Sequence, residues 1–167
     1  IPEPGFIDKA SEKVRSFFGA EIPAQPGTNV IMSNILVNAS QPKNPEEMSA
    51  TIAADALSIA TSISSRPKEY NERMYKFMMM IANYESNYGK HPDTHRDSPD
   101  RSTGFMQMIP NQSIAEVHRV LNLETADGVG EGVREYNRMV IDRLGPEYDL
   151  SQMTGADMDK PMYQALM

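Results

Sequence analysis

Residues 74–89 read MYKFMMMIANYESNYG, and apolar side chains recur in this stretch at the spacing of one helix face. The predicted inward face comprises Met74, Phe77, Met78, Ile81, Glu85 and Tyr88. Glu85 is its one charged member. A carboxyl group on a buried face loses hydration, which favours the protonated form that general acid catalysis needs. The alternative is that Glu85 lies at the helix end and points into water or pairs with a Lys or Arg.

A second segment strengthens the catalytic interpretation. Residues 81–89 read IANYESNYG, and residues 102–110 read STGFMQMIP. The pair resembles the lytic transglycosylases, a lysozyme-like family that cleaves peptidoglycan glycan strands and includes relatives of goose-type lysozyme. That family has Glu-Ser at a helix end, then Ser-x-Gly-Leu-Met-Gln-[Leu/Ile/Val]-x-Pro, then Ala-Tyr-Asn-x-Gly. Here Glu85-Ser86 is intact, Phe105 replaces the Leu, and Tyr136-Asn137 keeps the core of the third motif.

The resemblance, which covers roughly residues 70–140, implies a fold and a mechanism. The expected fold is all-α with at most a short β hairpin near 104–108, as in a lysozyme-like catalytic domain. Glu85 would donate the proton to the leaving oxygen and then act as base, so that the sugar closes a 1,6-anhydro ring. The residues expected to bind substrate or hold the acid are Ser86, Ser102, Gly104, Met106, Gln107, Tyr136 and Asn137. The alternative for Asn137 is a core amide with satisfied hydrogen bonds.

Some features of the site stay open at this point. The loop after the helix contains Asp93, Asp97 and Asp100, which are either solvated charges or a second carboxylate as in goose-type lysozymes. In the second case the alternative function is that of a hydrolytic goose-type lysozyme. Either Tyr148 or Tyr163 would be the family's closing tyrosine.

A metal-dependent endopeptidase that cuts peptide stems is the alternative enzyme. His91 and His95 are residue types that bind zinc, but Pro92 keeps them off one helix face, and the sequence predicts neither metal nor cofactor.

Composition excludes several classes of partner and site. The chain has 167 residues, enough for about one domain with a real core, and a net charge of −7. It lacks a cluster of Lys and Arg, so nucleic acid is not an expected partner. The absence of cysteine excludes disulfides and thiolate metal sites. Its longest apolar run, residues 77–82, is much shorter than the roughly 20 residues of a membrane span.

The predicted organisation is an N-terminal arm, residues 1–44, packed on a catalytic domain, residues 45–167. The arm contains an amphipathic stretch, residues 8–18, and an apolar run of uncertain type, residues 31–37. In the domain, Asn44-Pro45-Glu46-Glu47 carries the signals of a helix start, with an end near Arg66. Further helices are expected over 67–88, 110–121, 130–144 and 161–167, with a loop over 89–101 and a break over 128–132.

The start at Ile1, without Met or an export signal, suggests a product trimmed from a longer polypeptide. Together with the resemblance, this predicts a monomeric muralytic enzyme that acts on peptidoglycan glycan strands during phage entry or host lysis. The enzyme of an enveloped double-stranded RNA bacteriophage is one such case. The expected location is the virion or the host periplasm. The alternatives are a bacterial periplasmic enzyme and a silent glycan-binding virion domain.

Overall fold

The computed structural model describes residues 32–91, 102–122 and 128–167. Within these ranges the chain is helical, and the prediction of an all-α class is confirmed there. Its elements in chain order are α2 (Met32–Ala39), α3 (Ala50–Ser62), α4 (Lys68–Ser86), α5 (Pro110–Leu121), α6 (Gly128–Leu144), the 3-10 helices η1 (Pro146–Tyr148), η2 (Leu150–Gln152) and η3 (Gly155–Asp157), and α7 (Pro161–Leu166). A single antiparallel bridge joins Thr103 to Met108 in the described part of the chain.

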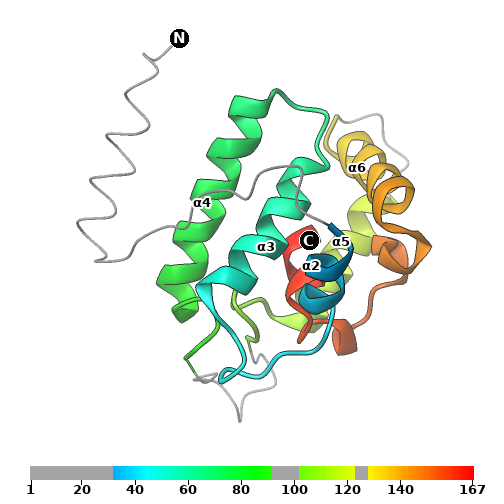
Figure 1. The fold of residues 1–167 in the computed structure, drawn as a ribbon. Coiled ribbons are helices and arrows are strands. Elements are labelled where there is room, and N and C mark those ends of the chain that lie inside the picture. The colour runs from blue at the N-terminus through cyan, green and yellow to red at the C-terminus, as the bar shows by residue number, and fades with distance from the viewer. Residues whose placement is uncertain (1–31, 92–101, 123–127) are drawn as a thin grey trace.

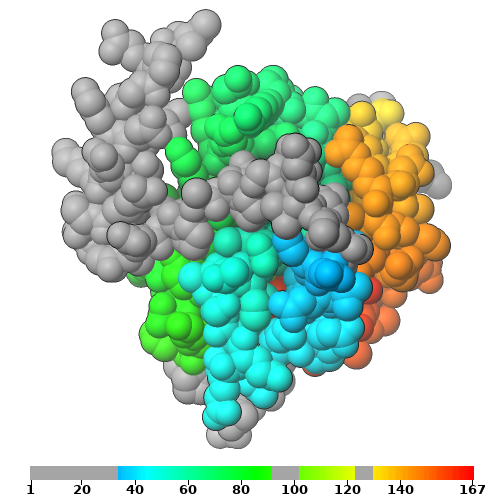
Figure 2. Space-filling model, viewed as in Figure 1, coloured from blue at the N-terminus to red at the C-terminus, as the bar shows by residue number. Residues whose placement is uncertain are grey.

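Helix α3 is the centre of the arrangement (Figure 1). It contacts α4 on one side, α2 on another and the C-terminal α7 behind, while α5 packs against α6 and against the 3-10 helices. The space-filling view shows the side chains of α2 and α3 side by side, with α6 at the edge of the same face (Figure 2). Residues 32–37 of the predicted apolar run thus belong to a helix, α2, that packs on the core.

Two groups of buried side chains form the core. The first joins α2, α3, α5, α6 and the C-terminal segment, and its members include Ala39, Ala56, Ile63, Val140, Leu150 and Met162. The second joins α3, α4 and the 103–108 hairpin, and its members include Met48, Leu57, Tyr75, Met79, Tyr88 and Phe105. The half-buried side chains of Met108 and Ala165 pack against both groups. The predicted site residues are divided between the two groups: Met106 belongs to the second group, whereas Tyr136 packs against the first.

The predicted start of the helix that ends near Arg66 is wrong. Asn44 does cap a turn, because its side-chain oxygen accepts hydrogen bonds from the backbone N–H groups of Glu46 and Glu47, each 3.0 Å long. However, that turn ends at once and Met48 turns into the core. The helix begins at Ala50, where the side chain of Ser49 accepts the N–H of Ile52. The capping signal at Asn44 therefore corresponds to an isolated turn, and the helix begins after it.

Other predicted boundaries differ in detail. Helix α6 begins at Gly128, two residues before the predicted start at 130, so the expected break over 128–132 is wrong. Helices α5 and α7 each begin at the proline that the sequence offers as a first helical residue. The stretch at 8–18 lies outside the described residues, and the division at residue 44 stays a prediction. None of the helices in the described ranges is both long enough and apolar enough to span a membrane.

The buried face of α4 is not the predicted one. The residues that the helix buries are Tyr75, Met79, Ala82 and Ser86. Of the predicted face, Met74, Met78 and Ile81 are half-buried, whereas Phe77 and Glu85 are exposed. The prediction that Glu85 is a buried acid is therefore wrong.

The error has a physical cause. The predicted and the observed face differ by one sequence position, or about 100° around the helix. Residues 78–81 are apolar on all sides, so their periodicity does not select one face. Ala82 and Ser86 are small and allow α4 to lie close to α3, whose buried side is rich in alanine.

Candidate functional site

Glu85 lies in the last turn of α4, and its side chain is exposed. The chain then reverses through three residues in the left-handed region, Asn87 at φ 48°, Tyr88 at φ 60° and Gly89 at φ 82°. The N–H of Asn87 caps the helix on the carbonyl of Asn83. A carboxylate in the last turn of a helix meets the negative end of the helix dipole, which disfavours it by roughly 0.3–1 kcal/mol. The position of Glu85 is therefore not explained by helix stability.

Ser86, the next residue, connects this helix end to the second motif. Its buried hydroxyl donates a 2.7 Å hydrogen bond to the carbonyl of Phe105 and accepts the N–H of Gly89 at 2.7 Å. Phe105 is buried and packs in the same core group as Tyr88. A Cβ added at Gly89 would lie 3.1 Å from that of Phe105. The Glu-Ser motif and the hairpin are thus held against each other through Ser86.

The 103–108 hairpin is closed by paired hydrogen bonds between Thr103 and Met108, at 2.8 and 3.1 Å. Gln107 has φ 50°, a conformation that non-glycine residues rarely adopt. Its amide nitrogen donates to the carbonyl of Gly104 at 2.8 Å, and its amide oxygen accepts the hydroxyl of Ser102 at 3.0 Å. Ser102 and Gln107 therefore brace the hairpin, and a contact of either with sugar stays a prediction.

Gln164 on α7 is a site residue that the sequence analysis missed. It is 1% exposed, accepts the N–H of Met106 at 3.1 Å and donates to the carbonyl of Met158. Gly104, at φ 74°, leaves the space that this amide fills, since a Cβ there would lie 1.5 Å from its nitrogen. The signal in the sequence was a lone amide on an otherwise apolar helix face. Gly104 thus serves a protein contact, and Met106 is buried.

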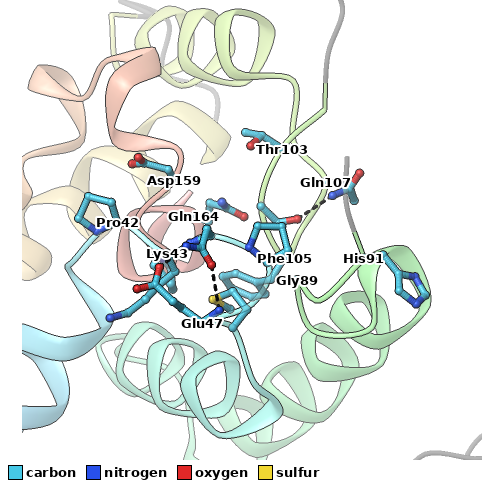
Figure 3. A pocket seen from close by; sticks show the side chains of 15 residues that line it. Pro42, Lys43, Glu47, Gly89, His91, Thr103, Phe105, Gln107, Asp159 and Gln164 are labelled. Atoms are coloured by element: carbon cyan, nitrogen blue, oxygen red, sulfur yellow. Dashed lines mark hydrogen bonds between the residues drawn. The ribbon is translucent and has the colours of Figure 1, made fainter. Parts of the chain in front are cut away.

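A cavity of about 440 Å³ lies on one side of the hairpin (Figure 3). Its walls come from the segment before α3, from the turn after α4, from the hairpin and from the start of α7. The polar groups that line it include Lys43, Glu47, His91, Thr103, Gln107 and Asp159. The cavity therefore presents both charge signs next to the Gly104–Gln107 turn.

The third motif lies in the other core group. The hydroxyl of Tyr136 donates to the carbonyl of Ala60 at 3.0 Å, and burial raises the pKa of Tyr136. Asn137 is buried; its nitrogen donates to Asp149 Oδ1 at 2.9 Å and its oxygen accepts the N–H of Leu150 at 2.8 Å. These contacts match the alternative of a core amide with satisfied hydrogen bonds. A role in binding sugar stays a prediction for both residues.

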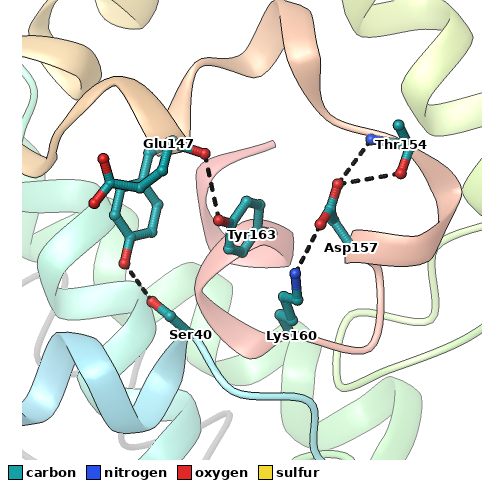
Figure 4. Close-up of polar contacts among 7 residues, drawn as sticks. Ser40, Glu147, Thr154, Asp157, Lys160 and Tyr163 are labelled. Atoms are coloured by element: carbon teal, nitrogen blue, oxygen red, sulfur yellow. Dashed lines mark hydrogen bonds and ion pairs between the residues drawn. The ribbon is translucent and has the colours of Figure 1, made fainter.

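The two candidate closing tyrosines stack on each other in the C-terminal segment. Their ring centroids are 5.3 Å apart. The buried Tyr148 shares a 2.6 Å hydrogen bond with the hydroxyl of Ser40, and the hydroxyl of Tyr163 donates to the carbonyl of Glu147 (Figure 4). Lys160 lies 5.0 Å from the centre of the Tyr163 ring. The Tyr148 hydroxyl therefore ties the C-terminal segment to the residue after α2, and the Tyr163 hydroxyl bonds within the C-terminal segment.

Asp55 is a second carboxyl group that the sequence analysis overlooked. It is the one charged residue of α3 and is half-buried, and burial raises the pKa of its carboxyl group. Burial, then the charges of Asp55 and Tyr88, raise the pKa of Tyr75 to about 12. Asp55 thus acts on Tyr75, a buried residue of α4.

The remaining candidates cannot be placed. His95, Asp93, Asp97 and Asp100 lie outside the described residues, and the described residues alone contain no group of three potential metal ligands. Comparison with known proteins identifies no relative: no family model, no curated protein and no solved structure matches the chain.

Proposed function

We propose that this protein is a muralytic enzyme that cleaves the β-1,4 bond between MurNAc and GlcNAc in peptidoglycan, on a lysozyme-like catalytic domain. One observation carries the proposal. The hydrogen bond from Ser86 to Phe105 joins the two most specific motifs of the sequence, which are far apart along the chain. Glu85, the only carboxylate in either motif, stands next to that contact.

The proposed mechanism uses Glu85 twice. Its carboxyl group protonates the glycosidic oxygen, the bond from C1 to that oxygen breaks, and positive charge develops at C1 of MurNAc. The Glu85 carboxylate then takes the proton of the 6-hydroxyl group of the same sugar, whose oxygen bonds to C1. The products are a free GlcNAc hydroxyl and a 1,6-anhydro end, and no water is consumed. A second carboxylate is not needed.

Two properties of Glu85 support this role. Its exposed side chain is accessible to a polymer too large to enter a closed cavity. Its place at the negative end of a helix dipole is one that stability alone would not favour, which is common for residues kept for function. The proposed site of action is the bacterial cell wall, reached from a virion or in the host periplasm, and the proposed active form is a monomer.

Glu85→Gln tests the proposal against a matched control, Glu69→Gln, an exposed carboxylate on the same helix. Clearing of purified cell walls is followed by turbidity. We expect Glu85→Gln to lose about 10²–10⁴-fold in rate, since the amide cannot act as an acid. Glu69→Gln should clear at the parental rate. Clearing by Glu85→Gln within about tenfold of the parent would exclude Glu85 as the acid.

A further inference from the structure

Three aromatic side chains stand on the outward face of α4. Tyr70 is 45% exposed, Phe77 is 54% exposed and Tyr84 is 68% exposed. They are spaced by seven residues, so successive rings advance about 10.5 Å along the helix and turn back by only about 20°. The outward face of a surface helix is ordinarily polar. This one instead carries a straight row of rings.

The row is continuous with other apolar surface and with the candidate acid. Met74, Met78 and Ile81 lie between the row and the buried face of α4, and they are half-buried. Met74 and Met78 also line a hollow of about 230 Å³ that Tyr70 borders. At the other end, Tyr84 directly precedes Glu85. Glu85 projects about 100° around the helix from Tyr84, on the side of Met78 and Ile81, so a linear ligand lying along the three rings would pass beside Glu85.

The spacing of the rings fits one class of ligand. About 10.5 Å is close to the length of one disaccharide unit in an extended β-1,4-linked glycan. Aromatic faces pack well against the apolar faces of sugar rings, and an amphipathic ring such as Tyr combines such a face with a polar edge. Aromatic side chains spaced by one disaccharide would each contact the same type of sugar.

Charge along the row fits peptidoglycan in particular. The stretch from Tyr70 to Tyr84 contains two cations, Arg73 and Lys76, and one carboxylate, Glu72, which lies 3.7 Å from Lys68. Arg66 lies beyond, 5.7 Å from the centre of the Tyr70 ring. The peptide stems of peptidoglycan carry carboxylates, which such cations attract.

We propose that Tyr70, Phe77 and Tyr84 form a binding track, and that this track holds a peptidoglycan glycan strand beside Glu85. This inference rests on the proposed function and adds a binding surface to it. Phe77, the middle ring, is the residue on which the track depends most.

Binding to purified, insoluble peptidoglycan sacculi tests the track. All variants are made in the Glu85→Gln background, so that the sacculi are not digested while binding is measured by co-sedimentation. We expect Phe77→Ala to weaken binding about three- to tenfold, as the loss of one ring contact implies. Phe77→Trp should keep the affinity. Val37→Ala, which shortens a 60% exposed side chain on α2, is the matched control and should bind like the parent.

Three outcomes would overturn the track. Equal binding by Phe77→Ala and the parent would exclude a ring contact at this position. A change in sedimentation coefficient with Phe77→Ala would make the face a contact between copies of the chain. A lower melting temperature with unchanged binding would mean that the ring packs against another part of this chain. A different result would separate the two proposals. If Phe77→Ala weakens binding but the single variant Glu85→Gln still clears cell walls, the track is supported and the catalytic role of Glu85 is rejected.

Discussion

The hydroxyl of Ser86 donates a hydrogen bond to the carbonyl of Phe105, 19 residues further along the chain. The same oxygen accepts the N–H of Gly89, so one buried side chain holds both the end of α4 and the 103–108 hairpin. The two motifs that carry the resemblance meet at this contact. Loss of the hydroxyl should loosen the surroundings of Glu85 without removing the acid itself.

Ser86→Ala should destabilise the protein. It leaves the Gly89 N–H and the Phe105 carbonyl without their partner, and each unsatisfied buried group costs about 1–3 kcal/mol. Urea unfolding followed by circular dichroism measures the loss, with the exposed Ser65→Ala as control. We also expect a lower rate of cell-wall clearing in Ser86→Ala. Stability equal to that of Ser65→Ala would show that the hairpin is held by other contacts.

Two glycines should respond in opposite directions to alanine. Gly104→Ala forces a Cβ into the amide of Gln164 at a φ of 74°, so we expect a loss of more than about 1 kcal/mol. Gly132→Ala lies within α6, with no atom within 4 Å of the added Cβ, and should gain about 0.5–1 kcal/mol. Denaturant unfolding of both variants provides the comparison. A stabilised Gly104→Ala would contradict the packing described for Gln164.

Asp149 predicts a pH-dependent contribution to stability. The hydrogen bond from Asn137, helped by those from Ser151, holds the pKa of this carboxyl group below its ordinary value. Folding therefore favours the ionised form. The contribution is present above the unfolded pKa of about 3.9 and is lost as pH falls through the folded pKa.

Asp149→Asn should therefore be less stable than the parent at pH 7, and the gap should narrow toward pH 3. Melting temperatures at the two pH values measure the difference, and the exposed Asp142→Asn serves as control. The effect should be modest because Asp149 is partly exposed. A gap that grows toward low pH would have the wrong sign for this hydrogen-bond arrangement.

Glu85→Gln should keep the fold and gain slightly in stability at pH 7. The exposed carboxylate meets the negative end of the helix dipole, so its removal should stabilise the protein by at most about 1 kcal/mol. Thermal unfolding beside the parent tests this. A loss above about 1 kcal/mol would mean that Glu85 holds a structural contact, and reduced clearing could then not be assigned to lost acid.

Much of the fold follows from local patterns in the sequence. Proline at the first helical position predicts the starts of α5 and α7, and the helix expected over 130–144 corresponds to α6 with the same C-terminal end. Periodicity fails where apolar residues surround the helix, as in α4. There the choice of face depends on how closely Ala82 can approach α3, which is a tertiary property.

The candidate site was predicted in part for a similar reason. The Glu-Ser and Gly-Phe-Met-Gln motifs predict a pair of segments, and the contact between Ser86 and Phe105 brings these segments together. Gln164 and Asp55 contribute through contacts with residues remote in sequence, so no local spacing indicates their roles. Gln164 is nevertheless a lone amide on α7 and Asp55 is the one charged residue of α3, a pattern similar to that of Glu85 on its predicted helix face.

Mass spectrometry of the fragments released from purified peptidoglycan tests the central claim most directly. The parent protein and Glu69→Gln should release muropeptides with 1,6-anhydro ends and intact peptide stems, whereas Glu85→Gln should release essentially none. The anhydro ends would identify a glycan cut made without water, as a single acid and base predicts. Fragments with cut stems and intact glycan strands, or the same anhydro products from Glu85→Gln, would contradict the claim that Glu85 cleaves the glycan.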